Sequence, residues 1–306
     1  MQSLRITVVV LAAAAALTFA ACRGSSNQAA STPAGGETDA GGSALGQARL
    51  NAAGKLGVDA FKVELKSLKE AGWDGCMGVK EPGKACAQLF TAGYVAIFEG
   101  AGKQLRYHVV GNKWLGPVDP AKADDGSPVA NEIAVDLLEV LTRYARHDWS
   151  LRTRTNPNSL VIEAVVPATA DPNAIDSYVR MTVKNATQWY RVGLSGISQV
   201  SPPDSASLPP SAAEAETLEQ AIRQDVATRG KGYLSDVSVL SYRLVTWPNG
   251  CIGIEKPGAV CAQALVPGFL VRVAAGGDVF RYHGANGQFT NANLQPGAVI
   301  TNPGPR

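Results

Sequence analysis

The 306-residue chain carries 28 Lys and Arg residues against 26 Asp and Glu residues, which gives a formal net charge of +2. No basic stripe with interleaved aromatic residues accompanies this near balance, so we expect no nucleic-acid partner. The roughly 260 residues that follow the amino-terminal segment are enough for two or three small domains rather than one large one.

The chain begins with a short apolar run. Arg5 precedes Ile6–Ala21, and this run is shorter than the roughly 20 residues that a membrane-spanning helix needs. It predicts a cleavable export signal over residues 1–21, and an uncut anchor helix is the alternative. The run ends in Leu-Thr-Phe-Ala-Ala-Cys over residues 17–22, which resembles the lipobox of bacterial lipoproteins, with Phe19 where Leu, Val or Ala is more usual. The resemblance implies a lipid on Cys22.

Residues 22–43 are rich in Gly, Ser, Ala and Thr and contain almost no large apolar side chain. Such a stretch cannot bury a core, so it predicts a flexible tether with a root-mean-square length of about 25 Å. A lipidated Cys22 would attach this tether to a membrane without a spanning helix. We therefore expect an extracytoplasmic protein, lipid-anchored to a bacterial cell membrane.

One segment of the chain occurs twice. Gly75–His108 and Gly250–His283 align without a gap at a constant offset of 175, and 13 of the 34 aligned positions are identical. The identities include two cysteines, a Pro-Gly turn, a Cys-Ala-Gln triplet and a final Arg-Tyr-His. The repeat predicts two structurally equivalent modules.

Cysteine pairing follows from the repeat. If Cys22 carries lipid, the other four cysteines form one pair in each copy, Cys76 with Cys86 and Cys251 with Cys261. Exported proteins retain disulfides, and closing a loop of this length stabilises the fold by about 3 kcal/mol on a chain-entropy estimate. A redox couple or a metal site is the alternative. The nine intervening residues differ from the usual C-x-x-C of redox pairs, and two Cys with one His are too few ligands for zinc. We expect no metal and no cofactor.

The elements repeat in the same order. A helix over Ser43–Leu56 precedes an alternating strand at Phe61–Leu68, the cysteine segment and a hairpin, and a helix from Ser211 begins the same series again. The sequence predicts an α+β fold of tandem small modules, each with one helix packed on an antiparallel β-sheet. The first cysteine module covers 44–118 and the second covers 211–290, after a Pro/Ser linker at 201–210. Residues 291–306 are expected to form an unpacked tail.

The middle unit, 119–200, contains no cysteine. An amphipathic helix is predicted over Asn131–Arg146, with strands at 159–166, 178–183 and 189–197. The three predicted helices begin about 80 residues apart, which favours a third unit of related layout over an unrelated insert. This order of elements resembles cystatin-like or PepSY-like modules in layout only, and no functional residue is transferred from either family. The cysteine repeat resembles segments of exported bacterial proteins of unassigned function.

A candidate binding surface comes from the end of each repeat. Arg and His stand two residues apart on a strand and therefore share a face, while the Tyr between them points to the other face. The pair forms either an anion- or partner-binding face or an ordinary solvated face. A Trp before each cysteine segment covers the disulfide, caps the sheet or provides an aromatic platform. The candidate residues are Arg106, His108, Arg281, His283, Trp73 and Trp247.

Catalytic motifs are absent from the sequence: it has no H-E-x-x-H, no G-x-S-x-G and no phosphate-binding loop. Gly193–Ile197 approaches the serine elbow but ends in Ile, and His147-Asp148 follows a helix, where a His commonly sits near the helix dipole. We predict a noncatalytic envelope protein that binds or scaffolds. An inhibitor of a secreted hydrolase, presenting the Pro-Gly segments Lys80–Ala85 and Glu255–Val260, is the alternative, and an uncharacterised hydrolase is the third hypothesis. The expected partners are the membrane, through the anchor, and an envelope protein or a secreted hydrolase.

Overall fold

The computed structural model describes residues 43–83, 85–129, 136–171, 174–301 and 303. The predictions for the export signal, the tether and Cys22 fall outside these residues. In the described ranges no helix has both the length and the apolar character needed to cross a bilayer.

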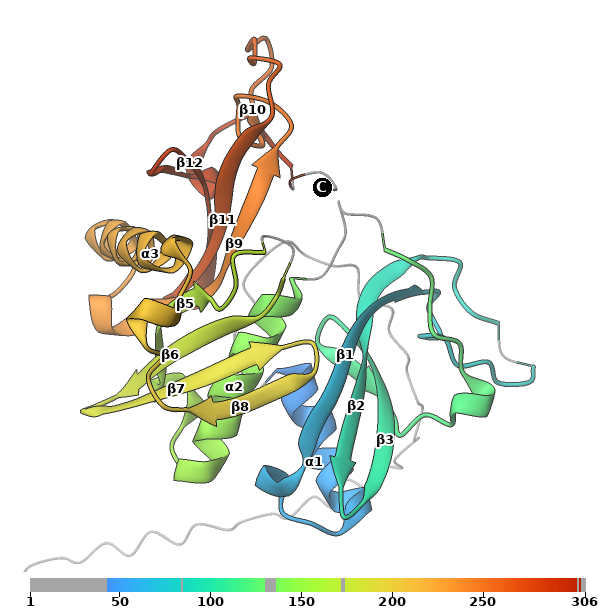
Figure 1. Ribbon diagram of the computed structural model, residues 1–306. Coiled ribbons are helices and arrows are strands. Elements are labelled where there is room, and N and C mark those ends of the chain that lie inside the picture. The colour runs from blue at the N-terminus through green and yellow to red at the C-terminus, as the bar shows by residue number, and fades with distance from the viewer. Residues whose placement is uncertain (1–42, 84, 130–135, 172–173, 302, 304–306) are drawn as a thin grey trace, which may run out of the picture. The chain divides into compact units, whose positions relative to one another are not determined.

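The described chain contains three helices, and each is followed by a four-stranded antiparallel sheet (Figure 1). This layout confirms the tandem α+β prediction. The first module contains α1 (Ala44–Leu56), β1 (Glu64–Trp73), β2 (Thr91–Gly100), β3 (Lys103–Val110) and β4 (Lys113–Leu115). The middle module contains α2 (Leu137–Thr153), β5 (Val161–Pro167), β6 (Ser177–Val183), β7 (Ala186–Gly193) and β8 (Gly196–Val200). The second cysteine module contains α3 (Pro210–Thr228), β9 (Ser238–Trp247), β11 (Val266–Ala275), β12 (Asp278–Ala285) and β13 (Gln288–Asn291).

Local signals set the ends of the first helix. The Ser43 side chain accepts a hydrogen bond from the Gly46 amide at the start of α1, and Gly57 ends the helix with φ +67°. Leu45, Ala48 and Ala52 lie on one face at helical spacing and are fully buried. In the middle module, the part of the predicted helix at 131–135 lies outside the described residues, and α2 begins at Leu137.

The middle module shares the layout of its two neighbours. In all three modules a short 3₁₀ turn joins the helix to the first strand, and a register shift follows the second or third residue of that strand. The shifts fall between Leu65 and Ser67, between Ile162 and Ala164, and opposite Arg272/Val273 in the pairing of β9 with β11. The related layout that the helix spacing favoured is therefore present.

A tyrosine–helix hydrogen bond also recurs in all three modules, and the sequence analysis overlooked it. In each case the fifth residue of the third strand is a buried Tyr whose hydroxyl donates to a polar side chain of its own module's helix. The bonds join Tyr107 to Asn51 at 2.8 Å, Tyr190 to Asp148 at 2.7 Å and Tyr282 to Asp225 at 2.8 Å.

One predicted strand of the middle module is wrong. Residues 189–197 were expected to form a single run, but they belong to two strands, β7 and β8, joined by a tight turn at Leu194-Ser195. Gly196 adopts φ +123°, a backbone conformation that residues with a Cβ atom rarely adopt. The sequence that approached a serine elbow is therefore the turn of a β-hairpin.

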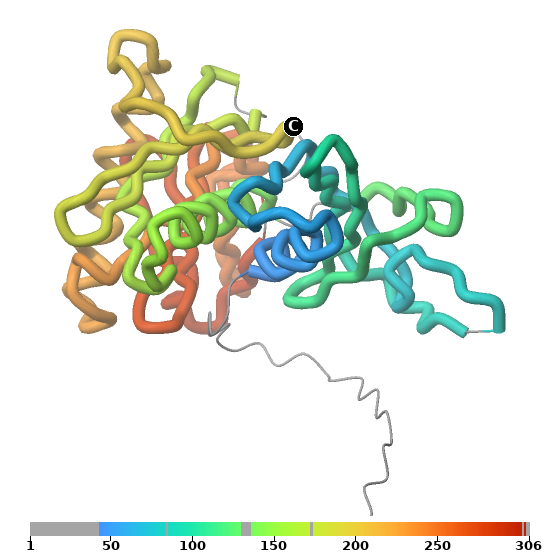
Figure 2. The backbone as a smooth tube through the Cα atoms, turned by 90° about the horizontal axis from the view of Figure 1, so that it is seen from below, coloured from blue at the N-terminus to red at the C-terminus, as the bar shows by residue number. Residues whose placement is uncertain are grey.

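Buried polar contacts join neighbouring modules. Helices α1 and α2 lie side by side (Figure 2), and Arg49 of α1 forms an ion pair of 2.7 Å with Asp148 of α2, with both side chains buried. Strand β5 lies against β9, and the Glu219 carboxylate of α3 accepts hydrogen bonds from the Val165 amide of β5. The modules therefore share one hydrophobic core rather than forming independent beads.

The prediction of an unpacked tail at 291–306 is wrong for its described part. A 3₁₀ turn spans Ala292–Leu294, and β14 (Val299–Ile300) pairs with β10 (Ile254–Glu255) in a two-stranded sheet. The segment is rich in Asn, Gly and Pro, and its pairing uses main-chain groups. An apolar pattern therefore could not reveal it.

Candidate binding surfaces

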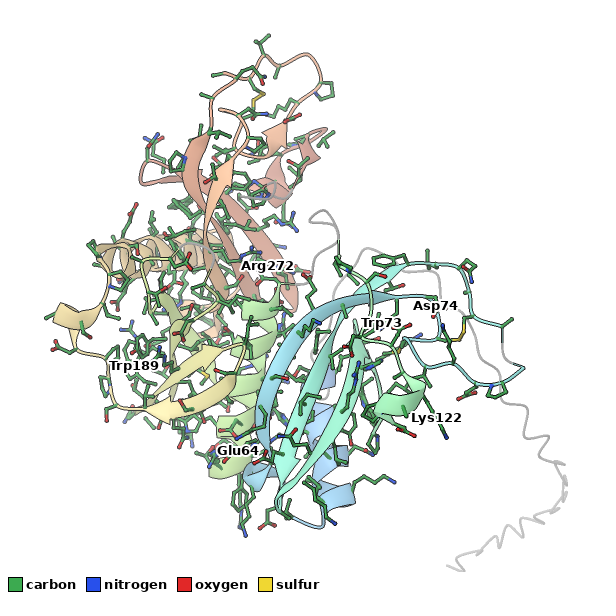
Figure 3. The ribbon with its side chains drawn as sticks, turned by 45° about the vertical axis from the view of Figure 1, so that its right-hand side comes forward. Glu64, Trp73, Asp74, Lys122, Trp189 and Arg272 are labelled. Carbon is green, nitrogen blue, oxygen red and sulfur yellow. A yellow bond between two sulfur atoms is a disulfide. The ribbon has the colours of Figure 1, made fainter. Side chains whose placement is uncertain are left out.

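The predicted disulfides are present. Cys76 is bonded to Cys86 and Cys251 to Cys261, each across a sequence separation of 10. Figure 3 shows Trp73 and Asp74 leading from β1 into the first of them. The Asp74 carboxylate lies within 4.8 Å of both sulfur atoms of its disulfide and accepts a hydrogen bond from the Cys76 amide. Because the two sulfur atoms are bonded to each other, neither is a thiolate ligand for a metal.

A tight turn follows the first cysteine of each pair. The Val79 amide donates to the Cys76 carbonyl, and the Ile254 amide donates to the Cys251 carbonyl. The central residues have positive φ in both copies: Met77 +53° and Gly78 +75° in the first, Ile252 +46° and Gly253 +72° in the second. A β-branched residue in this region is strained and persists only where the surrounding structure holds it.

The repeated histidines hold these turns. The His108 Nδ1 lies 2.6 Å from the Met77 carbonyl oxygen, and the His283 Nδ1 lies 2.8 Å from the Ile252 carbonyl oxygen. Since a carbonyl only accepts, Nδ1 must carry the hydrogen and Nε2 is left as an acceptor. Burial lowers the pKa of His108, and it lowers the pKa of His283 to about 4, so both imidazoles are neutral near pH 7.

The tryptophans complete the same arrangement. Trp73 stacks on His108 with ring centroids 4.5 Å apart, and Trp247 stacks on His283 at 4.6 Å. All four rings are buried, so the expectation that these residues form an accessible aromatic or histidine surface is wrong. The Trp rings belong to a small second core with Ala71 and Val95 in the first module and with Val245 and Leu270 in the second.

The physical reason for this error is that each cysteine module covers both faces of its sheet. One face packs on the helix and buries Tyr107 and Tyr282, as the sequence predicted. The other face, expected to be solvated, lies under the disulfide segment and a crossing segment. In the first module that crossing segment is Val118–Ser127, here called the strap, which pairs with β1 at Gly72 and with the cysteine turn at Val79.

The two arginines of the candidate surface differ. Arg106 of β3 donates from Nε to the His108 Nε2 at 2.9 Å, pairs through Nη1 with Asp125 of the strap at 2.7 Å, and donates from Nη2 to the Asp124 carbonyl at 3.0 Å. Arg281 stands at the same position of β12 and is half-buried. Its side chain forms no hydrogen bond or ion pair within the described residues.

The disulfide segments, here residues 76–90 and 251–265, expose apolar side chains that the sequence analysis did not select. Val260 is 98 % exposed and Leu265 is 74 % exposed in the second cysteine module, and Leu89 is 69 % and Phe90 is 44 % exposed in the first. Residues 80–83, 85 and 256–260 are exposed as well. The sequence could have indicated these exposed residues, because they are apolar but lie outside any strand or helix pattern.

His147 and Asp148 are not hydrogen-bonded to each other, because neither ring nitrogen of His147 has a partner among the described residues. Asp148 is engaged by Arg49, Arg152 and the Tyr190 hydroxyl. The His147 ring packs against Gly46, and burial, followed by the nearby Arg49, lowers the pKa of His147. The imidazole thus serves the packing of α2 on α1.

A shallow groove of about 470 Å³ lies where the middle and second cysteine modules meet. Arg146, Ser159, Asp236 and Asp278 are among the residues that line it. Its charges are mixed, and neither His147 nor either strand histidine lines it.

Comparison with known proteins recovers the repeat. Residues 45–115 and 219–291 each match a family described as "Domain of unknown function (DUF8738)". The first match covers α1 and its sheet, the second begins within α3 and covers its sheet, and both leave out the middle module. No curated protein and no solved structure matches the chain.

Proposed function

We propose that the protein is a noncatalytic binding protein of the bacterial cell envelope, attached to the membrane through Cys22, and that its two disulfide-closed segments contact the partner. The observation that carries the proposal is the exposure of Val260 inside the second disulfide loop and of Leu265, Leu89 and Phe90 just after the second cysteine of each pair. Apolar side chains that gather on one exposed segment are typical of surfaces that bind another protein.

The disulfides suit this role. Each one limits the conformations of a segment that lacks regular secondary structure over most of its length. A segment held in one conformation loses less entropy when it binds, so more of its contact energy appears as affinity. Two similar segments in one chain also allow two contacts, which raises overall affinity when both sites can engage together.

The placement of the histidines supports a noncatalytic protein. The chain has three histidines. Two hold the cysteine turns through main-chain carbonyls and the third packs between helices, so each imidazole has a structural task.

Inhibition of a secreted hydrolase is the second candidate function. Exposure of the Pro82-Gly83 and Pro257-Gly258 turns favours it, since an inhibitor must present a rigid segment to an enzyme cleft. A panel of secreted proteases and glycosidases, each assayed with an excess of the protein, separates the two functions. Inhibition that is lost in Pro257→Ala or Val260→Ser variants would favour the inhibitor.

The membrane attachment has its own test. A Cys22→Ser variant should leave the detergent-rich phase and fail to incorporate labelled palmitate, whereas the natural chain should remain in that phase and incorporate the label. Equal partitioning of the two proteins would refute the lipid anchor.

A further inference from the structure

The two disulfides have closely matched surroundings. All four bonded cysteines are half-buried, and each pair spans a sequence separation of 10. The glycine before the first cysteine donates its amide hydrogen to the carbonyl of the alanine after the second. These hydrogen bonds join Gly75 to Ala87 at 2.9 Å and Gly250 to Ala262 at 2.8 Å. A difference in reactivity between the two disulfides must therefore come from the few neighbouring side chains that the modules do not share.

The residue two positions before the first cysteine is one of these. Asp74 and Asn249 each accept a hydrogen bond of 3.0 Å from the following cysteine amide, but only Asp74 is charged. The Asp74 carboxylate lies within 4.8 Å of both sulfur atoms of its disulfide (Figure 3). Among the described residues, no Asp, Glu or His lies as close to both sulfur atoms of Cys251–Cys261. The carboxylate of Glu255 accepts a hydrogen bond from the Asn249 side chain at 2.9 Å instead.

A carboxylate beside a disulfide slows thiol–disulfide exchange. In exchange, a thiolate attacks one sulfur atom and the other sulfur leaves as a thiolate. A neighbouring carboxylate repels both the arriving and the departing anion. Two unit charges about 4 Å apart in water repel each other enough to change a rate about fivefold. Asp74 therefore protects Cys76–Cys86 against reduction, and Cys251–Cys261 lacks this protection.

The turn after the first cysteine provides a second difference. Met77 and Ile252 occupy the same turn position, with φ +53° and +46°. Branching at Cβ makes this conformation more strained for Ile252 than for Met77. The turn is held by the disulfide on one side and by the hydrogen bond from His283 on the other. Opening Cys251–Cys261 therefore releases more backbone strain than opening Cys76–Cys86 does.

We propose that Cys251–Cys261 is a thiol–disulfide exchange site for a dithiol oxidoreductase, whereas Cys76–Cys86 is a permanent structural bond. A thiolate of the reductant attacks Sγ of Cys261, whose neighbours at 256–260 and 262–265 are exposed, and Cys251 leaves as a thiolate. The second thiol of the reductant then displaces Cys261. Two electrons and two protons pass from the reductant to the protein, so the reductant becomes a disulfide and both cysteines become thiols.

Reduction has a consequence that rests on the proposed binding function. It opens the segment that carries Val260 and Leu265, the two most exposed apolar side chains of the second cysteine module. An open segment loses more entropy when it binds, so its contact with a partner becomes weaker. The first disulfide segment stays closed and keeps its contact. The redox state of one disulfide thereby sets how many strong contacts the protein makes.

Timed reduction compares the two disulfides in one protein. The full-length exported protein is incubated at pH 7 with dithiothreitol, free thiols are trapped at intervals with N-ethylmaleimide, and the labelled peptides around each pair are quantified by mass spectrometry. We expect Cys251–Cys261 to be reduced at least about fivefold faster than Cys76–Cys86. Equal rates, or faster reduction of Cys76–Cys86, overturn the proposal. Thioredoxin, as a protein dithiol, should show the same preference; if it reduces neither disulfide, the assignment to an oxidoreductase is wrong.

Matched variants assign the difference to the carboxylate. Asp74→Asn should raise the reduction rate of Cys76–Cys86 about fivefold, and Asn249→Asp should lower that of Cys251–Cys261 by a similar factor. Each replacement keeps a side-chain oxygen that can accept from the cysteine amide, as the other module shows. The disulfide left untouched in each variant is the control for the fold. An unchanged rate in Asp74→Asn refutes the electrostatic protection.

Failure of this inference and failure of the proposed function can be told apart, because the reduction rates are measured without a partner. If photoreactive groups on the disulfide segments capture no protein, the proposed function fails and the rates still decide the exchange site. If a partner is captured, the double variant Cys251→Ser, Cys261→Ser should weaken capture at Val260 and leave capture at Leu89 unchanged. Unchanged capture at Val260 would refute redox control of binding.

Discussion

The second cysteine module should lose stability in mild acid because of His283. Its pKa is about 4 in the folded protein and 6.5 without the fold, so the folded state binds the proton more weakly. The free energy of unfolding is therefore highest above pH 6.5, and it falls as the pH drops from 6.5 toward 4. The free energy of unfolding changes by about 1.36 kcal/mol per pH unit between pH 6.5 and pH 5. It therefore falls by about 2 kcal/mol between pH 7 and pH 5.

Hydrogen exchange measures this effect locally. The amides of β12 should exchange about thirtyfold faster at pH 5 than at pH 7, after correction for intrinsic rates, which is the equivalent of about 2 kcal/mol.

A variant assigns the effect to the ring. His283→Phe keeps an aromatic ring to stack on Trp247 but cannot titrate, and it loses the hydrogen bond to the Ile252 carbonyl. We expect it to be about 1 kcal/mol less stable than the natural protein at pH 7 and to show no fall between pH 7 and pH 5 in β12. An unchanged acid response in this variant would refute the reasoning.

Three further predictions concern buried groups. Burial raises the pKa of Glu219 well above its usual range, so its contribution to stability is present at low pH and is lost as pH rises. Urea unfolding across pH should show this loss in the natural protein and not in the Glu219→Gln variant. Arg49→Ala breaks a buried ion pair and should cost about 3–5 kcal/mol in urea unfolding, whereas Arg191→Ala, at a half-exposed pair, should cost far less. Gly46→Ala should lower the melting temperature because its Cβ would lie 2.9 Å from a ring carbon of His147, while Gly54→Ala, which meets nothing within 4 Å, should raise stability by up to about 1 kcal/mol.

The sequence was sufficient for the tandem α+β fold and for the disulfides. Both follow from the exact recurrence of short-range features: the cysteine spacing, the Pro-Gly turns and the hairpin glycines. Gly102 and Gly277 adopt φ values of +71° and +87° in the hairpin turns, as the turn chemistry requires. Local rules apply to these features because neighbouring residues in the chain determine them.

The positions of His108 and His283 could not be predicted in the same way. Strand alternation correctly separated each His from its Tyr, but it cannot reveal that a distant segment covers the second face of the sheet. The strap and β14 form that cover through main-chain hydrogen bonds, which leave no trace in side-chain patterns. The helix spacing indicated the related layout of the middle module, but it did not reveal the recurring hydrogen bond between the buried Tyr190 and its helix partner.

Photo-crosslinking in the cell envelope tests the proposed function most directly. A photoreactive phenylalanine at Val260 or Leu89 should form a discrete product with one partner, and the same group at the exposed Tyr233, far from the cysteines in sequence and 81 % exposed, should not. The product should disappear when unlabelled natural protein is added in excess. Equal crosslinking from Val260, Leu89 and Tyr233, or none from the two disulfide segments, would contradict the account.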